Sequence, residues 1–580
     1  YLEYLNLKKE KSTSVSRKIS SLKSFYKFLY KNDYIDKKDY PLVKVTYPKK
    51  EKKLPKFLYY NDLLEIINES SKDKDGIRDR LIIEMLYATG VRVSELINIK
   101  LSDIDFNNKR IIVCGKGNKE RIVYYGDYAE EVLLKYLKTH IELCTKEVKR
   151  TAYDSRLNGL SKYYLERYSN DLHLFKDVYN CNLINAFKHF QDIGVLEIIT
   201  CGATHGYFPI LYVNEKTIRA QIAVGVETYK KYFGKQPRGI WLPECGYVHE
   251  ADKYLKEFGI EYIITESHGI LYADPTPIFG TFAPISTPNG IAAFGRDIES
   301  SRQVWSSVCG YPGDFNYREF YRDIGYDADY DYIKPYIAKN GVRVNTGIKY
   351  HRITGKTEFK DYYNVQWAKD SAEKQAGHFL DSRVNQINDL SKFMDVPPIV
   401  VCPYDAELYG HWWYEGPYWL YVLFKKIYYD DCNFKLITPG EYIDKYPRMQ
   451  IASPCRSSWG ANGYSEVWLN PTNDYAHKHL HVAGDRMCEL ARLYPNAKGL
   501  KKKALNQCAR ELLLAQSSDW LFIITNGTMV DYAKKRIKDH IGRFTKLYEQ
   551  IKADKIDEEF LKSIMKLDKI FPDIDYMIYY

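Results

Sequence analysis

The sequence changes character near residues 138–146, and this boundary limits what the chain can fold into more than any other feature. Residues 1–140 carry 29 Lys and Arg against 20 Asp and Glu, whereas the whole chain of 580 residues has a net charge of +10. Nearly all of the excess positive charge therefore precedes the boundary. A chain of this length has room for two or more domains, each with its own core. We predict two unlike parts rather than one uniform domain.

The composition narrows the class of protein. Hydrophobic residues make up 45% and charged residues 28% of the chain, as in a folded soluble protein. No apolar run is long enough to predict a membrane span. The first residues, YLEYLNLKKEK, lack both an apolar signal-peptide stretch and an initiator Met, so we expect that the start is missing. The eleven Cys contain no CxxC pair, which predicts a reduced, cytoplasmic protein without structural zinc.

Several patterns in the first quarter suit a nucleic acid. The apolar residues of segment 12–31 are spaced by three and four, which predicts an amphipathic helix; alone, it reads as a solvated surface helix. The basic linker YPKKEKKLPK (47–56) can lie along phosphates. Arg92 follows a turn at Gly90, where its guanidinium can hold a phosphate or pair with a surface carboxylate. Lys116 lies at a predicted hairpin tip, GKGNKER.

Together, ATGVRVSEL (88–96) and GKGNKER (115–121) resemble the tyrosine recombinases of the Xer type. The resemblance implies that Arg92 is the first catalytic arginine and Lys116 the catalytic lysine. Residues 1–46 would end the helical core-binding domain, and residues 47–140 would begin the catalytic domain. The HxxR motif and tyrosine nucleophile of the family do not follow, so strand cleavage is not expected. We expect residues 1–140 to be a remnant that binds DNA non-specifically.

Beyond the boundary, apolar strand-like runs alternate with helical stretches. Such runs occur at 194–206, 239–247, 260–268 and 397–410, and each ends in polar or small residues. A helical segment without proline, 141–178, precedes them. Strands that alternate with helices, with functional side chains after each strand, predict a barrel whose site lies at the carboxyl ends of the strands.

Two carboxylates follow apolar strands in aromatic surroundings. Glu244 follows GIWLP, and Asp405 follows PPIVVCPY. A single acid at a strand end can equally be a helix cap or a loop charge. Two such acids beside Trp and Tyr indicate glycoside chemistry, which needs one carboxylate as nucleophile and one as acid/base. If the mechanism retains configuration, the carboxyl groups should lie about 5–5.5 Å apart.

Residues 141–580 resemble the α-1,4-glucan branching enzymes of glycoside hydrolase family 57. The resemblance rests on five segments: EIITCGATHGYFP (197–209), WLPECGY (241–247), VWSSVCGYPGDFNYREFYRDIGYD (304–327), PYDAELYGHWW (403–413) and SSWGANGYSEVWLN (457–470). It implies Glu244 as nucleophile, Asp405 as acid/base and His205 as an active-site histidine. The candidate substrate-binding residues are His205, His411, Trp412, Trp459 and Trp468. For Trp459 and Trp468, packing in the core is the alternative.

The predicted fold class follows from both resemblances. It is α/β: an incomplete (β/α)7-type barrel over 141–470 with a C-terminal helical domain over 471–580, preceded by a mostly helical recombinase-like fragment. The first barrel strand of the family, with its HxHxPY-type motif, does not precede residue 141. No metal or cofactor is expected; HKHLH (477–481) lacks an HExxH pattern and predicts a helix surface.

Three functions follow from this sequence. The first is an α-glucan branching enzyme, acting on amylose- or glycogen-like chains and impaired by truncation. The second is a DNA-binding remnant without catalysis, and the third is a non-functional chimera. No partner at a membrane is expected.

Overall fold

The structure is a computed structural model, and it describes residues 12–31, 34–36, 104–105, 110–115, 119–124, 128–306, 309–337, 341–357, 359–430 and 432–580. The chain divides into two compact units, Tyr1–Tyr125 and Gly126–Tyr580. Arg92, Lys116 and the basic linker 47–56 lie outside the described residues. Among the helices that the structure describes, none is both long and apolar enough to cross a membrane.

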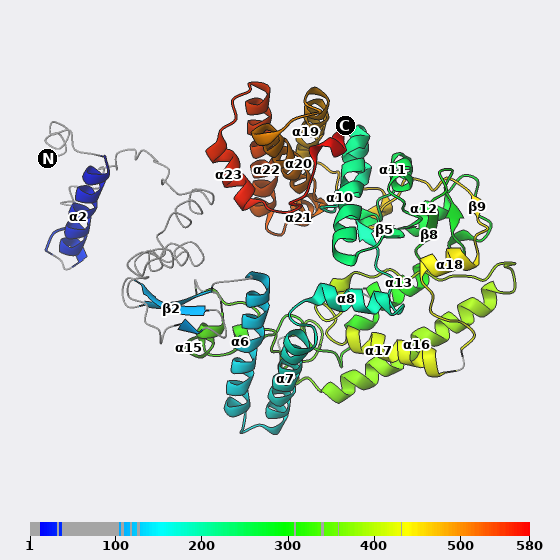
Figure 1. The fold of residues 1–580 in the computed structure, drawn as a ribbon. Helices are drawn as coiled ribbons and strands as arrows, with labels where there is room; N and C mark the ends of the chain where they lie inside the picture. The colour runs from blue at the N-terminus through cyan, green and yellow to red at the C-terminus, as the bar shows by residue number, and fades with distance from the viewer. Residues whose placement is uncertain are drawn as a thin grey trace, which may run out of the picture. The chain divides into compact units, whose positions relative to one another are not determined.

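The described part of the first unit contains one helix and one small sheet (Figure 1). Helix α2 spans Ser12–Lys31, which confirms the helix predicted from its apolar spacing. Strands β1 (Ile104–Asp105), β2 (Arg110–Gly115) and β3 (Lys119–Tyr124) form an antiparallel sheet in that order. The hairpin predicted at GKGNKER is confirmed by β2 and β3, which pair in antiparallel register.

A single helix, α6 (Tyr128–Arg150), runs through the boundary recognised in the sequence. The compact units meet at 125/126, so the sequence boundary at 140/141 lies inside this helix. Leu137 on one side of the boundary and Leu143 on the other are both buried. Helix α7 (Ser155–His173) packs against α6, and its Tyr168 ring lies 5.0 Å from the ring of His140. Both sides of the boundary therefore contribute to one helix pair.

The helical segment predicted over 141–178 is interrupted at 151–154. There Asp154 adopts an extended conformation and its carboxylate accepts hydrogen bonds from the backbone N–H groups of Arg156 and Leu157. This is an N-cap, which begins a new helix because it satisfies backbone donors that lack partners in the first turn. A short π-helix, Leu174–Val178, extends α7.

A six-stranded sheet lies at the centre of the second unit, in the order β4-β5-β6-β8-β7-β9. β4, β5, β6 and β8 are parallel, whereas β7 is antiparallel to β8 and parallel to β9. The strands are β4 (Thr200–Cys201), β5 (Gly239–Trp241), β6 (Tyr262–Thr265), β7 (Ile285–Ser286), β8 (Ala292–Gly295) and β9 (Gln450–Ile451). β4 and β9 are the end strands within the described residues, as expected for an incomplete barrel.

The run at 397–410 was predicted as a strand, but it forms none: Tyr409 bridges only to the nearby Trp413, and Val401 forms one parallel bridge with Arg296. The Val401–Arg296 bridge still aligns the segment with the carboxyl end of β8. The other helices between α7 and the C-terminal region are α8 (Leu183–Asp192), α9 (Phe208–Leu211), α10 (Glu215–Phe233), α11 (Asp252–Glu257), α12 (Ser267–Leu271), α13 (Ile298–Trp305), α14 (Ile324–Asp327), α15 (Tyr330–Ile333), α16 (Val365–Leu390), α17 (Gly416–Tyr429) and α18 (Pro439–Lys445).

Helix α10 approaches the sheet closely at Gly225. A Cβ at this position would lie 2.2 Å from the carbonyl oxygen of Cys201 in β4, so no larger residue fits without movement. The Thr200 hydroxyl donates a hydrogen bond to the Gly225 carbonyl over 3.0 Å. The glycine therefore fixes the distance between α10 and the edge of the sheet.

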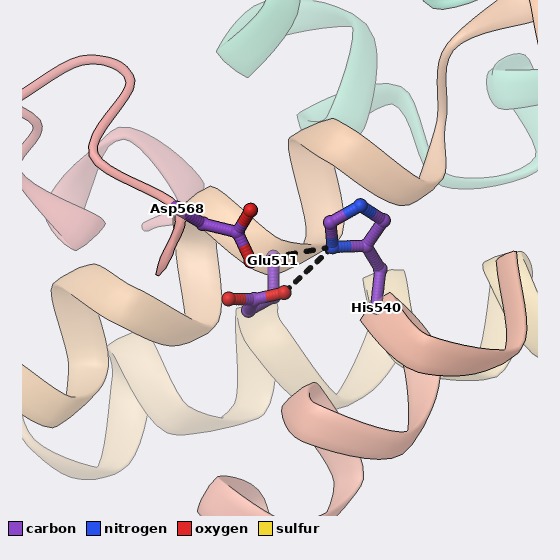
Figure 2. Close-up of side chains that lie close together, drawn as sticks. All are labelled: Glu511, His540 and Asp568. Carbon is purple, nitrogen blue, oxygen red and sulfur yellow. Dashed lines mark hydrogen bonds and ion pairs between the residues drawn. The ribbon is translucent and has the colours of Figure 1, made fainter. Parts of the chain in front are cut away.

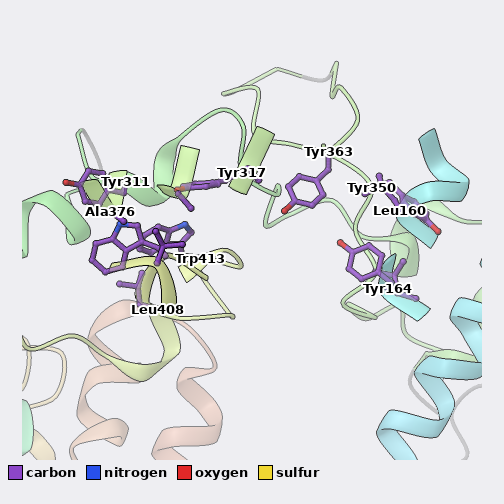
Figure 3. Close-up of a cluster of buried hydrophobic side chains, with 14 of the residues drawn as sticks. Leu160, Tyr164, Tyr311, Tyr317, Tyr350, Tyr363, Ala376, Leu408 and Trp413 are labelled. Atoms are coloured by element: carbon purple, nitrogen blue, oxygen red, sulfur yellow. The ribbon is translucent and has the colours of Figure 1, made fainter. Parts of the chain in front are cut away.

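An aromatic cluster joins α7, the residues between α13 and α16, α16 and the segment that follows Asp405 (Figure 3). Trp413 and Tyr317 are each only 1% exposed, and their rings lie 5.7 Å apart. Tyr164 of α7 donates a hydrogen bond to the carbonyl of Lys349 over 2.8 Å. Burial of such large rings dominates the energetics of a core. The segment that carries Asp405 is thus held by packing on its C-terminal side.

The C-terminal region is helical, as predicted, and contacts α10. It consists of α19 (Tyr475–Leu493), α20 (Gly499–Ala515), α21 (Ser518–Asn526), α22 (Val530–Lys552) and α23 (Glu558–Leu567). His477 and His481 of α19 were predicted on a helix surface, but His477 is only 6% exposed. Each Nε2 lies 3.0 Å from a backbone carbonyl oxygen, that of Trp468 for His477 and that of Ile210 for His481. Both histidines therefore attach α19 to neighbouring segments.

Glu511, His540 and Asp568 form a buried cluster between α20, α22 and the end of α23 (Figure 2). His540 Nδ1 lies 2.7 Å from the Glu511 carboxylate, and Arg536 donates to His540 Nε2 over 2.9 Å. Because Nε2 accepts, the ring proton must be on Nδ1, which is then no free metal ligand. Arg543 also donates to Asp568 over 2.8 Å. The cluster fits an ionic lock between helices and does not fit a metal.

We expect Glu511→Ala to lower the free energy of unfolding by about 3 kcal/mol or more, because it leaves buried donors without their acceptor. Denaturant unfolding measures this loss. Asp389→Ala, which removes an exposed carboxylate paired with Lys392 at the end of α16, is the matched control and should cost less than about 1 kcal/mol. Equal losses in the two variants, or destabilisation of the unaltered chain by a chelator, would contradict the ionic lock.

Candidate active site

Glu244 lies in a strained turn directly after β5. Its φ angle is 60° and that of Cys245 is 51°, a left-handed conformation that costs energy for residues other than glycine. Pro243 and Cys245 on either side are buried, whereas Glu244 is only partly buried. The turn therefore anchors its neighbours in the core and leaves the Glu244 carboxylate at the carboxyl end of the strand.

Both oxygens of the Glu244 carboxylate accept hydrogen bonds. Trp459 donates its indole Nε1–H to Oε2 over 2.7 Å, and the Ser518 hydroxyl donates to Oε1 over 2.8 Å. His205 Nε2 lies 3.8 Å from Oε1, and His205 itself has a φ of 57°. Two acceptor oxygens are the arrangement of an ionised carboxylate. The structure thus brings together Glu244, His205 and Trp459, three residues that the sequence assigned to the site.

Asp405 lies four residues after the Val401–Arg296 bridge and begins a short helical turn, Ala406–Leu408. Burial raises the pKa of its carboxyl above the ordinary value, and the negative charges of Glu244 and Glu407 raise it further; Arg296 and His205 oppose the shift. Glu244 and Asp405 therefore lie in each other's electrostatic field. This asymmetry, with one carboxylate held by two donors and the other favoured in its protonated form, suits a nucleophile beside an acid/base.

Arg296 is a site residue that the sequence reasoning missed. It forms an ion pair with Glu266 over 3.0 Å, donates to Ser301 over 2.8 Å, and its guanidinium lies 5.8 Å from the Trp459 ring centre. The same rule that identified Glu244 would have found it, because Arg296 follows the apolar strand β8 immediately. Arg296 thus lies near Trp459, which donates a hydrogen bond to Glu244, and its positive charge also acts on Asp405.

Ser518 is the second missed residue, and no sequence signal pointed to it. It is fully buried at the start of α21, in the C-terminal helical region, and its backbone N–H donates to the His205 carbonyl over 3.1 Å. A lone serine 274 positions after Glu244 is not recognisable from spacing. The helical region therefore contributes a direct contact to the carboxylate.

The remaining predicted substrate-binding residues fall into two groups. Trp468 is only 1% exposed and its ring lies 4.7 Å from that of Tyr207, so it packs inside the protein and offers no face to a sugar. Trp412 is 51% exposed and stacks on Phe320, with 4.8 Å between ring centres, and the His411 ring lies 5.4 Å from the same Phe320. Trp412 and His411 thus share one exposed aromatic surface, and their substrate role stays a prediction.

We expect Ser518→Ala to lower the turnover rate by about tenfold to a hundredfold, because a hydrogen bond to a charged group contributes about 1.5–3 kcal/mol. Steady-state rates of the catalysed reaction measure the effect. Ser517→Ala is the matched control, since among the described residues the Ser517 hydroxyl bonds the nearby Asp519 carboxylate, over 3.3 Å, and not Glu244. A loss of the same size in both variants would mean that the loop geometry, rather than the hydroxyl, supports Glu244.

Two family models match this chain. The glycosyl hydrolase family 57 model matches residues 28–383, which include Glu244, and the model of the C-terminal part of 1,4-alpha-glucan branching enzymes matches residues 479–579, which include Ser518. Asp405 and Trp459 lie between the two matched ranges.

Relatives and solved structures agree with the family models. The 1,4-alpha-glucan branching enzyme of Thermococcus kodakarensis is 30% identical over 480 residues, which cover 77% of this chain and 67% of the relative. Its crystal structure matches with a TM-score of 0.68, over 78% of this chain and 83% of that one. The alpha-amylase AmyC of Thermotoga maritima matches with a TM-score of 0.73 and 44% identity, over 78% and 86% of the two chains.

A separate similarity covers a smaller share of the chain. Tyrosine recombinase XerC of Staphylococcus epidermidis is 48% identical over 141 residues, which are 24% of this chain and 46% of the recombinase. The chain thus covers less than half of that relative's length, and its similarity to recombinases is limited to one segment. The family model over more than half of the chain, the branching-enzyme C-terminal region and the shared fold together show that this chain belongs to glycosyl hydrolase family 57.

Proposed function

We propose that this chain is an α-glucan branching enzyme that acts by retaining glycosyl transfer. The observation that carries the proposal is the pair of unlike carboxylates: Glu244, with both oxygens accepting hydrogen bonds, and Asp405, whose pKa is raised by burial and by the charge of Glu244. Family membership and the similarity to the Thermococcus branching enzyme support the substrate class, an α-1,4-linked glucan.

In the first step, Asp405 donates its proton to the glycosidic oxygen while Glu244 attacks the anomeric carbon. The C1–O4 bond breaks, the shortened chain leaves with a new 4-OH, and a β-glucosyl ester forms on Glu244. The raised pKa of Asp405 keeps the required proton available at a higher pH than that of an ordinary aspartic acid. Trp459 and Ser518 orient the attacking carboxylate.

In the second step, Asp405 removes the proton from a 6-OH group of an acceptor chain, and that oxygen displaces Glu244 from C1. The product is an α-1,6 branch, and both carboxylates return to their starting states. Water in place of the acceptor gives hydrolysis instead, so transfer requires acceptor sites that hold sugar and exclude water. Trp412 and His411, on their exposed aromatic surface, are proposed to serve the acceptor.

Hydrolysis is the second candidate outcome, and one observation favours it. The matched structure with the higher identity, 44%, is that of an alpha-amylase. We therefore expect part of the reaction to go to water instead of to an acceptor chain.

Incubation with amylose separates these outcomes. Branching lowers the iodine-complex absorbance without new reducing ends, and a debranching enzyme then releases short chains. Hydrolysis produces reducing ends in proportion to the loss of absorbance. A chain that changes neither quantity, with its fold intact by circular dichroism, would contradict the proposed function.

DNA binding by residues 1–140 remains a second proposal, supported by the similarity to XerC and by the excess of positive charge there. Such binding should be weak, independent of DNA sequence and strongly reduced by salt. Fluorescence anisotropy with a labelled duplex tests it, because affinity that does not change with ionic strength would exclude a phosphate-based interaction.

A further inference from the structure

A groove of about 810 Å³ lies between helices α16 and α17, outside the residues of the active site. The two helices pack against each other and are neighbours in Figure 1. The lining residues come from α16 and from α17 or its end: Glu373, Lys374, Gly377, His378 and Asp381 on one side, and Tyr418, Tyr421, Val422, Lys425, Lys426, Tyr429 and Asp430 on the other.

Gly377 of α16 lines the groove without a side chain. A Cβ at this position would meet nothing nearer than the Cε of Lys426, at 4.0 Å. Glycine inside a helix costs roughly 1 kcal/mol relative to alanine. Here an alanine would fit sterically, so packing does not require the glycine.

Three tyrosines line the α17 side. Tyr418 and Tyr421 have ring centres 6.1 Å apart and planes tilted by 34°, and the Tyr418 hydroxyl donates to Glu373 across the groove over 2.7 Å. Tyr421 is 57% exposed and Tyr429 is 73% exposed. Positions 418, 421, 425 and 429 share one face of the helix, so the exposed rings follow the groove. Two adjacent, mutually tilted rings form a curved apolar surface on which successive sugar rings can pack.

The charges of the groove are balanced. Three lysines, 374, 425 and 426, face three carboxylates, Glu373, Asp381 and Asp430. Lys425 also lies 5.7 Å from the ring centre of Tyr421, and Lys426 lies 3.9 Å from Asp430. A balanced set gives no net field to attract a phosphate or a nucleic acid. It provides both donors and acceptors for hydroxyl groups, which suits a neutral polyhydroxyl ligand.

We propose that the α16–α17 groove binds a linear α-1,4-glucan chain outside the catalytic site. Exposed tyrosines would pack on the C–H faces of the glucose units, and the balanced charged groups would hydrogen-bond their hydroxyls. This inference rests on the proposed function for the identity of the sugar. Its role is to hold a long glucan near the enzyme, so it affects long chains and leaves short oligosaccharides unaffected.

The test is native gel electrophoresis of the full chain in gels with and without amylopectin. Tyr421→Ala combined with Tyr429→Ala removes two exposed rings without changing the charge, and we expect its dissociation constant for amylopectin to rise about tenfold. Tyr153→Ala is the matched control, because Tyr153 is 78% exposed, lies between α6 and α7 and does not line the groove. It should be retarded like the unaltered chain.

Two further arms separate this inference from the proposed function. Glu244→Gln should keep its retardation by amylopectin, since the groove does not contain Glu244. If the unaltered chain is retarded but has no activity on any glucan, and the double variant is not retarded, the result would support the groove and reject the proposed function. Equal retardation of the double variant and the unaltered chain would overturn the groove, whatever the activity.

Discussion

Glu244→Gln should abolish glucan rearrangement, with a loss of at least about 10⁴-fold in turnover, because the amide cannot form the covalent ester on which both steps depend. Gln retains the shape of the side chain, so the contacts with Trp459 and Ser518 can persist. Iodine-complex absorbance and reducing-end assays measure the loss, and circular dichroism checks that the fold is kept.

Chemical rescue gives this prediction a positive arm. Glu244→Gly opens space at C1, and azide then replaces the missing carboxylate with an activated substrate such as α-maltosyl fluoride. The expected product is a β-glycosyl azide, formed by a single inversion. Full activity of the Gln variant, or an α-configured azide product, would contradict the nucleophile assignment.

Asp405→Asn should lower the rate on unactivated glucan by about 10²–10⁴-fold, the usual contribution of a general acid–base group. The loss should be much smaller for the formation of the covalent intermediate from α-maltosyl fluoride, because fluoride leaves without a proton. Glu244→Gln should be inactive with both substrates. This contrast distinguishes the acid/base from the nucleophile. If the activity of Asp405→Asn fell equally with both substrates, the result would contradict the role of Asp405.

The pH dependence follows from the raised pKa of Asp405. Its protonated form, which the first step needs, persists to a higher pH than an ordinary aspartic acid allows, so the alkaline limb of the rate profile should disappear in Asp405→Asn. A carboxyl whose pKa is raised on folding stabilises the protein at low pH, and this contribution is lost as the pH rises through the folded-state pKa. Asp405→Asn should therefore unfold at a higher temperature than the unaltered chain at neutral pH.

Part of this site was predictable because its residues obey a local rule. Glu244 follows an apolar strand, and the chain direction alone places it at the carboxyl end of the sheet. Helix α2 and the β2–β3 hairpin were likewise predicted from spacing and turn residues. Arg296 obeys the same rule and was missed only because its strand, β8, was not recognised.

Other features depend on contacts between distant segments, which no local pattern encodes. Ser518 reaches Glu244 from a helix in the C-terminal region. Trp468 is of a residue type that suits sugar binding, yet its ring is buried against that of Tyr207. The boundary between the two sequence types coincides with no break in the backbone, since α6 is continuous through it and is buried on both sides. Both sequence types place apolar residues at helical spacing, so one continuous helix can form across the junction between them.

The covalent intermediate itself offers the most direct test of the central claim, that Glu244 and Asp405 form a retaining pair. Asp405→Asn should form the ester from α-maltosyl fluoride and hydrolyse it slowly, because the base of the second step is absent. Peptide mapping by mass spectrometry after rapid denaturation should find a maltosyl group on the peptide that contains Glu244. Release of fluoride without any adduct, or an adduct on another residue, would contradict the account.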